Sequence, residues 1–197
     1  MAKCLVLGAN GLIGSYIVDE LVEKGHKVRG FDRYGLDRVN YKNSDKVEQV
    51  AGDFLNRDDL KKALKGIDYV FHFISTTTPI TAENDPLIDI ETNIRMSVEL
   101  FQLCVEAKIK RIIYPSTGGA VYGSSVAVGS AHKEIDPTLP VSPYAIGKLT
   151  VENYLHYFYR KFDLDYIVFR ISNPYGSRQS ARSKQGVIPI FLDHIHN

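Results

Sequence analysis

Short apolar runs alternate with amphipathic stretches along the chain. Several of the runs are apolar at consecutive positions, which is typical of strands buried on both faces of a parallel sheet. The stretches between them repeat their apolar residues at helical spacing. The pattern predicts strands at residues 3–8, 27–32, 46–53, 68–74, 111–116 and 165–171, and helices at residues 12–24, 57–65, 86–108 and 143–162.

The alternation of strand and helix predicts a doubly wound (Rossmann) α/β fold, a parallel sheet with helices on both faces. The helix at 86–108 has clear start signals, because Asp85 can cap it and Pro86 suits its first position. Its expected buried face consists of Ile90, Ile94, Ser97, Val98, Phe101, Cys104 and Val105.

Composition and charge exclude several classes of function. Hydrophobic residues make up 44% and charged residues 24% of the 197 residues, as in ordinary globular domains. The 24 Lys and Arg residues nearly balance 23 Asp and Glu, which gives no electrostatic reason to expect nucleic acid or an anionic membrane as partner. No apolar run approaches the roughly 20 residues that span a bilayer, and no signal peptide precedes the first strand. Cys4 and Cys104 lie in apolar segments, so we expect buried thiols in a reducing compartment, the cytoplasm.

The six histidines do not predict a metal site. His194 and His196 are two positions apart on a predicted helix, so their side chains point to different faces. His72 ends a buried strand, where we expect it to pack or form a hydrogen bond.

A glycine-rich turn joins the first predicted strand to the first helix. In "GANGLIG", Gly8, Gly11 and Gly14 follow the spacing of a dinucleotide-binding turn. Leu12 and Ile13 start the helix, whose free N–H groups and positive dipole end favour phosphate. The turn predicts a bound dinucleotide.

Asp32 ends the second strand, where a carboxylate can accept hydrogen bonds from the adenosine ribose. It would repel a 2′-phosphate, so NAD is favoured over NADP. The next residue, Arg33, either lies in a solvated loop or pairs with such a phosphate. Asp53 ends the third strand and either meets the adenine amino group, with Phe54 beside it, or caps the next helix, for which Asn56 is better placed.

"VSPYAIGK" places Tyr144 and Lys148 four residues apart near the start of a helix, so they share one face. An ammonium group and an oxidised nicotinamide ring near the phenol would lower its pKa from about 10. Such a tyrosine can take a proton from a sugar hydroxyl while hydride leaves the same carbon. Lys148 would also hold the nicotinamide ribose.

The ordered segments "GANGLIG", "AGDF", "DYVFHFI", "RIIYPSTGGAVYG", "KEIDPTLPVSPYAIGK" and "FRISNPYGSRQ" resemble the extended short-chain dehydrogenase/reductases, in particular the NAD-dependent epimerase/dehydratase family typified by UDP-glucose 4-epimerase. The resemblance implies a nucleotide-sugar epimerase, acting on a UDP-sugar through transient oxidation at C4. A one-way sugar-nucleotide dehydrogenase or reductase, or a non-catalytic NAD-binding member, are the alternatives.

The resemblance also assigns roles to residues. Tyr144 becomes the catalytic base with Lys148 as its partner, and Asn173 meets a substrate phosphate. The residues implied along the cofactor are Phe73, Ser75, Thr77 and Asn93.

Two segments of the chain depart from the family pattern, the loop after the fifth predicted strand and the segment after the fourth. Gly118 occupies the position where the catalytic hydroxyl often lies, which leaves Thr117 or Ser116 for that role, with Thr117 preferred; Ser116 is also a candidate substrate contact. The Thr-Asp-Glu group of the sugar dehydratases is missing from this loop, which argues against dehydration. A hydroxyl-rich segment, "HFISTTTP", replaces the usual small residues after the fourth strand.

The family adds a smaller C-terminal lobe that closes over the nucleotide-sugar. We therefore expect residues 1–186 to form the NAD-binding domain with the catalytic pair, and residues 187–197 to begin a truncated substrate region. Arg178, Arg182 and Lys184 either contact a pyrophosphate or lie in a solvated loop. Family members often form homodimers through the helices that correspond to 86–108 and 143–162, although core packing explains their aromatic residues equally well.

Overall fold

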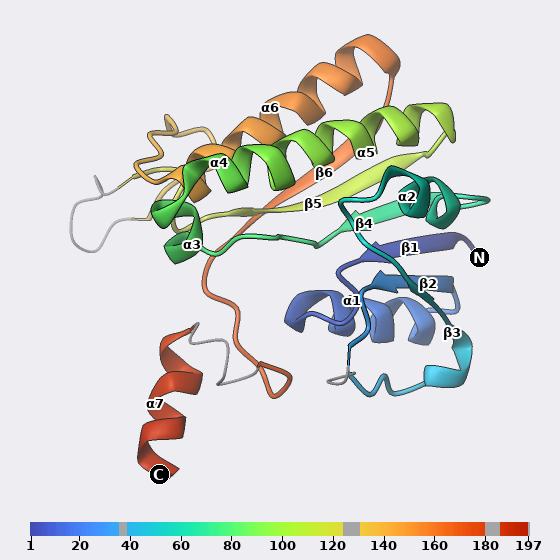
Figure 1. Cartoon of the computed structure of the whole chain (residues 1–197), viewed down its shortest axis with the longest axis horizontal. Helices are drawn as coiled ribbons and strands as arrows, with labels where there is room; N and C mark the ends of the chain where they lie inside the picture. Colours follow the sequence, from blue (N-terminus) through green and yellow to red (C-terminus); the bar gives the residue numbers. More distant parts are fainter. Residues whose placement is uncertain (36–38, 124–130, 180–185, 197) are drawn as a thin grey trace.

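The computed structural model describes residues 1–35, 39–123, 131–179 and 186–196. This part of the chain forms a six-stranded parallel sheet in the order β3-β2-β1-β4-β5-β6 (Figure 1). The order is that of a doubly wound fold, as predicted. The strands are β1 (Lys3–Leu7), β2 (Lys27–Asp32), β3 (Val47–Ala51), β4 (Tyr69–His72), β5 (Arg111–Thr117) and β6 (Asp165–Ile171).

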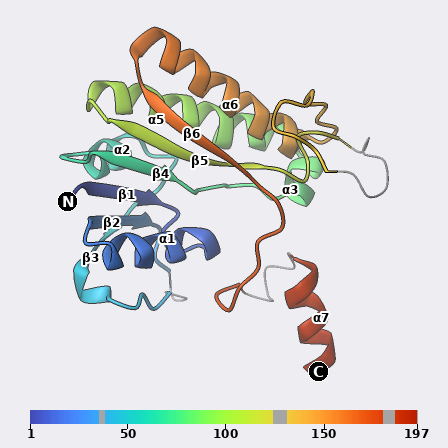
Figure 2. The same ribbon diagram turned by 180° about the vertical axis from the view of Figure 1, so that it is seen from behind.

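Helices cover both faces of the sheet, as Figure 2 shows from behind, and an apolar cluster lies under each layer of helices. One face packs against α2 (Arg57–Ala63), α5 (Arg95–Glu106) and α6 (Pro143–Phe162), with Leu60, Phe101 and Leu155 in the core. The other face packs against α1 (Leu12–Glu23), which contributes Val18 and Val22. The remaining described helices are η1 (Ser44–Lys46), α3 (Pro79–Asn84), α4 (Pro86–Ile88), η2 (Asp89–Ile94) and α7 (Val187–His196).

The helix predicted at 86–108 begins as expected but is not a uniform α-helix. Asp85 caps it by accepting the Leu87 N–H, and Pro86 follows. Residues Asp89–Ile94 then form a π-helix before α5 starts. A π-turn holds more residues than an α-turn and rotates the following side chains around the axis. The expected burial of Ile90 is therefore wrong: it is 50% exposed, and Asp89 is buried in its place.

Helix α3 was not predicted. It starts with a capping box in which Thr78 and Thr81 satisfy each other's backbone N–H groups, and Pro79 occupies its first position. The segment after β4 is a run of threonines followed by a proline and has no apolar residues at helical spacing. The hydrophobic pattern alone could therefore not reveal this short helix.

The sheet brings its functional loops together at the carboxyl ends of the strands. In the sheet, Leu7 of β1 lies beside Phe31 of β2 on one side and His72 of β4 on the other. The strand order reverses between β1 and β4, and this crevice is where doubly wound sheets bind their ligands. The segments that follow β1, β4 and β5 all leave the sheet at this edge.

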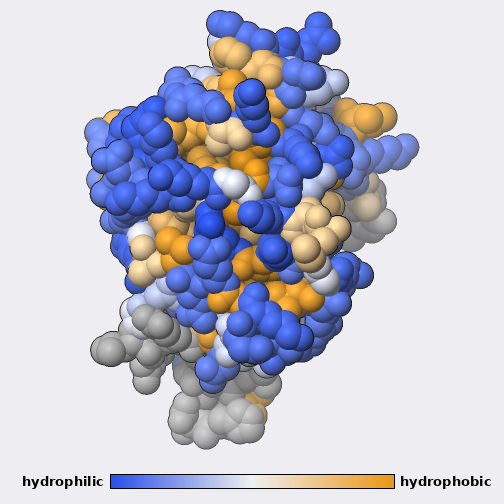
Figure 3. All heavy atoms as spheres, turned by 90° about the vertical axis from the view of Figure 1, so that its right-hand side faces the viewer, coloured by the Kyte–Doolittle hydropathy of each residue, from blue (hydrophilic) through white to orange (hydrophobic). Residues whose placement is uncertain are grey.

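Figure 3 views the molecule from the side on which the N-terminus lies, and there hydrophilic side chains interleave with smaller apolar areas. None of the helices in the described ranges has the length and apolar character that a bilayer-spanning segment needs. Cys4 and Cys104 are both buried free thiols, as expected of core residues.

Candidate active site

The turn between β1 and α1 brings the start of the helix close to the strand. A Cβ at Gly14 would lie 2.1 Å from the Gly8 carbonyl oxygen, so only glycine allows the helix to start this close to the strand. Gly11 is the N-cap residue and provides no side chain for the first free N–H groups of α1. Leu12 and Ile13 begin the helix, where these groups and the positive end of the dipole favour an anion. The turn therefore fits the pyrophosphate of a dinucleotide.

Asp32 lies next to this turn, at the end of β2. Its Oδ2 accepts the Asn10 backbone N–H at 2.9 Å, and its Oδ1 accepts the Arg33 backbone N–H at 2.8 Å. The two bonds fix the carboxylate at the edge of the crevice while the side chain stays half-buried. This placement suits the ribose contact predicted for Asp32.

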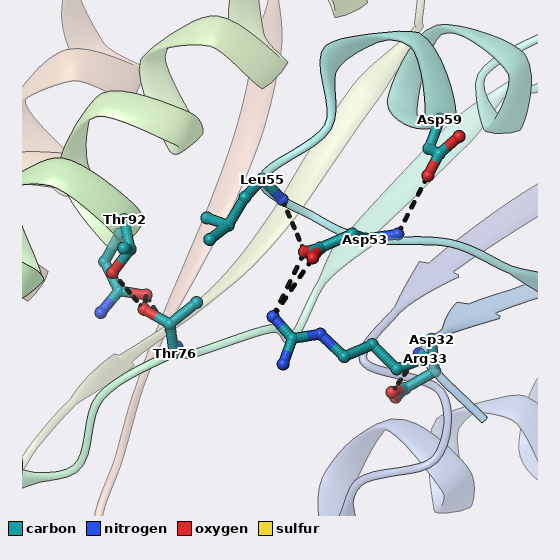
Figure 4. A network of polar contacts seen from close by, with 8 residues as sticks. Asp32, Arg33, Asp53, Leu55, Asp59, Thr76 and Thr92 are labelled. Atoms are coloured by element: carbon teal, nitrogen blue, oxygen red, sulfur yellow. Dashed lines mark hydrogen bonds and ion pairs between the residues drawn. The ribbon is translucent and has the colours of Figure 1, made fainter. Parts of the chain in front are cut away.

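Arg33 and Asp53 form an ion pair across the same edge (Figure 4). The Arg33 Nη2 lies 3.3 Å from Oδ1 and 3.4 Å from Oδ2 of Asp53. Asp53 also accepts the Leu55 N–H at 3.0 Å, and its own N–H donates to the Asp59 carboxylate at 3.1 Å. The bond from Leu55, followed by Arg33, lowers the pKa of Asp53. Asn56 caps α2, so the Asp53 side chain is not needed for that purpose.

Phe54 lies in the core rather than at the surface. It is 3% exposed, and its ring centre lies 5.2 Å from that of His72. Contact between Phe54 and an adenine would therefore involve its backbone.

The segment after β4 is tied to the π-helix by side-chain amide and hydroxyl groups. Asn93 accepts the Thr76 N–H at 2.9 Å and donates to the Thr77 hydroxyl at 2.7 Å. Figure 4 also shows the Thr76 hydroxyl bonded to Thr92. The Ser75 hydroxyl donates to the Thr77 carbonyl oxygen at 2.9 Å. The hydroxyl groups of this segment thus bond to one another's backbone and to side chains of the π-helix.

The structure brings three of the predicted cofactor residues, Ser75, Thr77 and Asn93, into this network. Phe73 immediately follows β4, and its N–H donates to the Leu7 carbonyl oxygen at 2.9 Å. Thr77 is buried, and its hydroxyl donates to Asp89. Because that hydroxyl faces inward, Thr77 shapes the segment rather than presenting a free hydroxyl to a ligand.

Helix α6 presents Tyr144 and Lys148 to a small cavity. Ser142 caps the helix, and Pro143 occupies its first position. The Lys148 ammonium donates to the Pro115 carbonyl oxygen at 3.0 Å and lies 5.8 Å from the Tyr144 ring centre. The walls of the cavity include Tyr144, Lys148, His72, Asp89, Ser97 and Tyr114.

Burial shifts the pKa values of both residues in the pair. Loss of hydration lowers the pKa of Lys148 to about 8, against the opposing effect of Asp89. Burial, followed by Asp89, raises the pKa of Tyr144. The prediction of a lowered Tyr144 pKa assumed an oxidised nicotinamide ring beside the phenol, and in the polypeptide alone burial raises that pKa.

His72 behaves as predicted for a buried histidine. Its Nε2 lies 2.9 Å from the Ser97 Oγ, and the side chain is 1% exposed. Burial, followed by the charge of Lys148, lowers the His72 pKa to about 3. The ring is therefore neutral at physiological pH and contributes packing and a hydrogen bond.

Asp89 is a site residue that the sequence analysis missed. It is 3% exposed and accepts hydrogen bonds from Thr77 and from Asn93, the latter at 2.8 Å. A Cβ at Gly147 would lie 2.0 Å from the Asp89 Oδ2, so glycine lets this carboxylate touch α6 between Tyr144 and Lys148. Asp89 lies off the apolar face predicted for a uniform α-helix, and the π-helix turns it inward, so the hydrophobic pattern gave no signal for it.

Ser116 and Thr117 end β5 and differ in accessibility. Ser116 is 5% exposed, and its hydroxyl has no hydrogen-bond partner within the described residues. Thr117 is half-buried at the end of the strand. A hydroxyl that touches substrate has to be reachable, which favours Thr117, as the sequence analysis preferred.

The segment after β6 crosses back to α1. Asn173 is exposed there. Arg178 pairs with the buried Asp19 of α1 and lies over the Tyr16 ring, 4.6 Å from its centre. Arg178 therefore anchors the segment instead of lying in a solvated loop, while Arg182 and Lys184 fall outside the described residues.

The described residues contain no group of three or more His, Cys, Asp and Glu side chains placed to hold a metal ion.

The NAD dependent epimerase/dehydratase family model matches residues 4–197. The chain belongs to this family. It is 34% identical over 201 residues to a UDP-glucose 4-epimerase of Mycolicibacterium smegmatis, covering 97% of this chain and 62% of that protein. It is 30% identical over 206 residues to a dTDP-4-dehydro-6-deoxyglucose reductase of Escherichia coli, covering 98% and 62%.

A solved structure supports the same relationship. The UDP-glucose 4-epimerase of Thermotoga maritima with UDP-glucose superimposes with a TM-score of 0.88 at 33% identity, covering 97% of this chain and 62% of that one. The chain thus spans about three-fifths of the length of these relatives. NAD is the cofactor of this epimerase/dehydratase family, and the glycine-rich turn and Asp32 fit it.

Proposed function

We propose that the whole protein is a nucleotide-sugar 4-epimerase that acts on a UDP-sugar. The observation that carries the proposal is the placement of Tyr144 and Lys148 on one cavity, at the sheet edge that also holds the glycine-rich turn. A protein that only binds a dinucleotide has no need of this pair. The epimerases among its relatives support the same activity.

In the proposed mechanism Tyr144 removes the proton from the C4 hydroxyl of the sugar. NAD held by the glycine-rich turn and Asp32 would supply the hydride chemistry at C4. Lys148 holds its ammonium beside the phenol and stabilises the phenolate. The 4-keto sugar then presents its other face, and Tyr144 returns the proton to the oxygen as hydride returns to carbon. Protons and hydride balance, so the cofactor is regenerated in each cycle.

Thr117 is proposed as the hydroxyl that assists Tyr144, and Asn173 as a contact to the substrate phosphate. Substituting Thr117→Val removes the hydroxyl with little change of shape, and Ser116→Ala is the matched control. We expect kcat to fall about 100-fold or more in Thr117→Val, in the range of general acid–base contributions. A larger loss in Ser116→Ala would assign the role to Ser116.

The activity is tested with a full-length form of the protein. Incubation with UDP-glucose and UDP-N-acetylhexosamines, followed by sugar analysis, should show conversion at C4 without net formation of NADH. Tyr144→Phe should abolish conversion while NAD binding persists. Full turnover by Tyr144→Phe would refute the proposed role of the tyrosine.

The second candidate is a one-way sugar-nucleotide reductase, favoured by the 30% identical E. coli relative. Net consumption of NADH with a 4-keto sugar nucleotide, without interconversion of 4-epimers, would identify this activity. Tyr144 and Lys148 serve both reactions, so these residues do not distinguish them.

The domain and assembly assignments are also proposals. Residues 1–186 form the NAD-binding domain, and residues 187–197 begin the substrate region. A cytoplasmic homodimer through residues 86–108 and 143–162 is supported by Tyr154 and Tyr157 of α6, which are 39% and 44% exposed. Sedimentation velocity tests the dimer, which Tyr154→Arg should weaken.

A further inference from the structure

Arg33 lies between two carboxylates at the edge of the nucleotide crevice. In Figure 4 its side chain extends away from Asp32 and toward Asp53. Both Asp32 oxygens already accept backbone N–H groups, from Asn10 and from Arg33 itself. The guanidinium instead contacts both oxygens of Asp53, at 3.3 and 3.4 Å.

Asp53 is a fixed acceptor for this guanidinium. The Leu55 N–H donates to its Oδ1, and its own backbone N–H is held by Asp59. The ion pair itself is open to solvent, with side-chain exposures of 69% for Arg33 and 46% for Asp53. The Asp53 carboxylate is therefore held in place, but the ion pair is weak enough for a competing anion to break it.

We infer that Asp53 helps this protein to discriminate against dinucleotides with a 2′-phosphate, by holding Arg33 away from the ribose edge marked by Asp32. The inference rests on the NAD site described above. An arginine directly after the ribose-binding acid is the neighbour best able to neutralise a 2′-phosphate. As long as Asp53 competes for that arginine, the phosphate faces Asp32 without full compensation. Asp53 thereby disfavours the 2′-phosphate without contacting it.

The test is the ratio of NADP to NAD affinity in Asp53→Asn. Binding of NAD is measured by titration calorimetry and that of NADP by competition with NADH fluorescence, which also detects weak binding. If Asp53 also contacts the adenine, this contact is common to both cofactors and cancels in the ratio. The ratio should rise up to about fivefold at low salt, as expected for release of an exposed ion pair, and less at high salt.

Two further variants separate release of Arg33 from simple removal of a negative charge. Asp58→Asn removes a neighbouring exposed carboxylate that has no described bond to Arg33, and should leave the ratio unchanged. In the Arg33→Ala background, Asp53→Asn should also leave it unchanged, because no guanidinium remains to be released.

An equal rise in the ratio with or without Arg33 would overturn the inference, since it would show only charge repulsion by Asp53. So would an unchanged ratio in Asp53→Asn alone. Failure of the unsubstituted chain to bind NAD would overturn the cofactor assignment together with this inference. Loss of sugar turnover with NAD binding intact would affect only the proposed function.

Discussion

A largely buried ion pair ties helix α6 to the sheet, and its removal should destabilise the protein measurably. Arg170 of β6 donates to the Glu152 carboxylate of α6, with Nη2 2.8 Å from Oε2 and Nε 3.2 Å from Oε1. The Arg170 Nη1 also donates to the Tyr122 hydroxyl at 2.6 Å. Glu152 lies on the same helix as Tyr144 and Lys148, so this network fixes that helix against β6 and the segment after β5.

The expected magnitude follows from the exposure of the two side chains. Arg170 is 22% and Glu152 11% exposed. Breaking a fully buried pair costs about 3–5 kcal/mol, and breaking a surface pair about 0–1 kcal/mol. Glu152→Gln keeps the side-chain size and leaves the guanidinium with a neutral acceptor, so we expect a loss of about 2 kcal/mol in unfolding free energy. For a domain of this size that corresponds to a fall in Tm of about 4–8 °C.

Thermal unfolding followed by circular dichroism measures this difference. The control is Glu20→Gln, which breaks the exposed pair with Lys24, whose side chains are 64% and 57% exposed for lysine and glutamate. That pair should contribute about 0.3–0.5 kcal/mol and shift Tm by about 1 °C. Equal shifts in the two variants would refute the argument that burial gives the Arg170–Glu152 pair its larger effect.

Three more predictions concern single side chains. Asp32→Ala should weaken NAD binding about tenfold and NADP binding less, because a charged acceptor of ribose hydroxyls is lost. Titration calorimetry with both cofactors measures this, and an unchanged ratio of NAD to NADP affinity would contradict it. Asp89→Asn should lower the pKa of Lys148 below its value of about 8, since Asp89 favours the ammonium form. The pH midpoint of Lys148 methylation should then shift to lower pH, and a shift to higher pH would contradict the argument. The pKa of His72 is about 3 in the folded chain and 6.5 ordinarily, so below pH of about 6.5 the unfolded chain takes up a proton that the folded chain excludes. The free energy of unfolding therefore decreases as the pH is lowered. Between pH of about 6.5 and about 5 this should cost about 1.5 kcal/mol, and urea unfolding of His72→Gln should show a weaker pH dependence.

The sequence by itself determined the parts that depend on near neighbours. The glycines at 8, 11 and 14 predicted the turn that approaches the backbone closely, because such a turn has to be made within a few residues. Consecutive apolar residues predicted the parallel strands, and Ser142 with Pro143 marked the start of α6. Tyr144 and Lys148 share a helix face for the same local reason.

The tertiary structure decided the contacts between residues far apart in sequence. Which residue of the helix at 86–108 turns inward depended on the π-turn, which places Asp89 against α6 at Gly147. The partner of Arg33 depended on the neighbouring position of β2 and β3, which brings Asp53 within reach. The Tyr144 pKa depended on burial, which a sequence does not state. These properties arise from strand order, helix register and exclusion of water, and each is set by the packing of the whole sheet rather than by the few residues on either side.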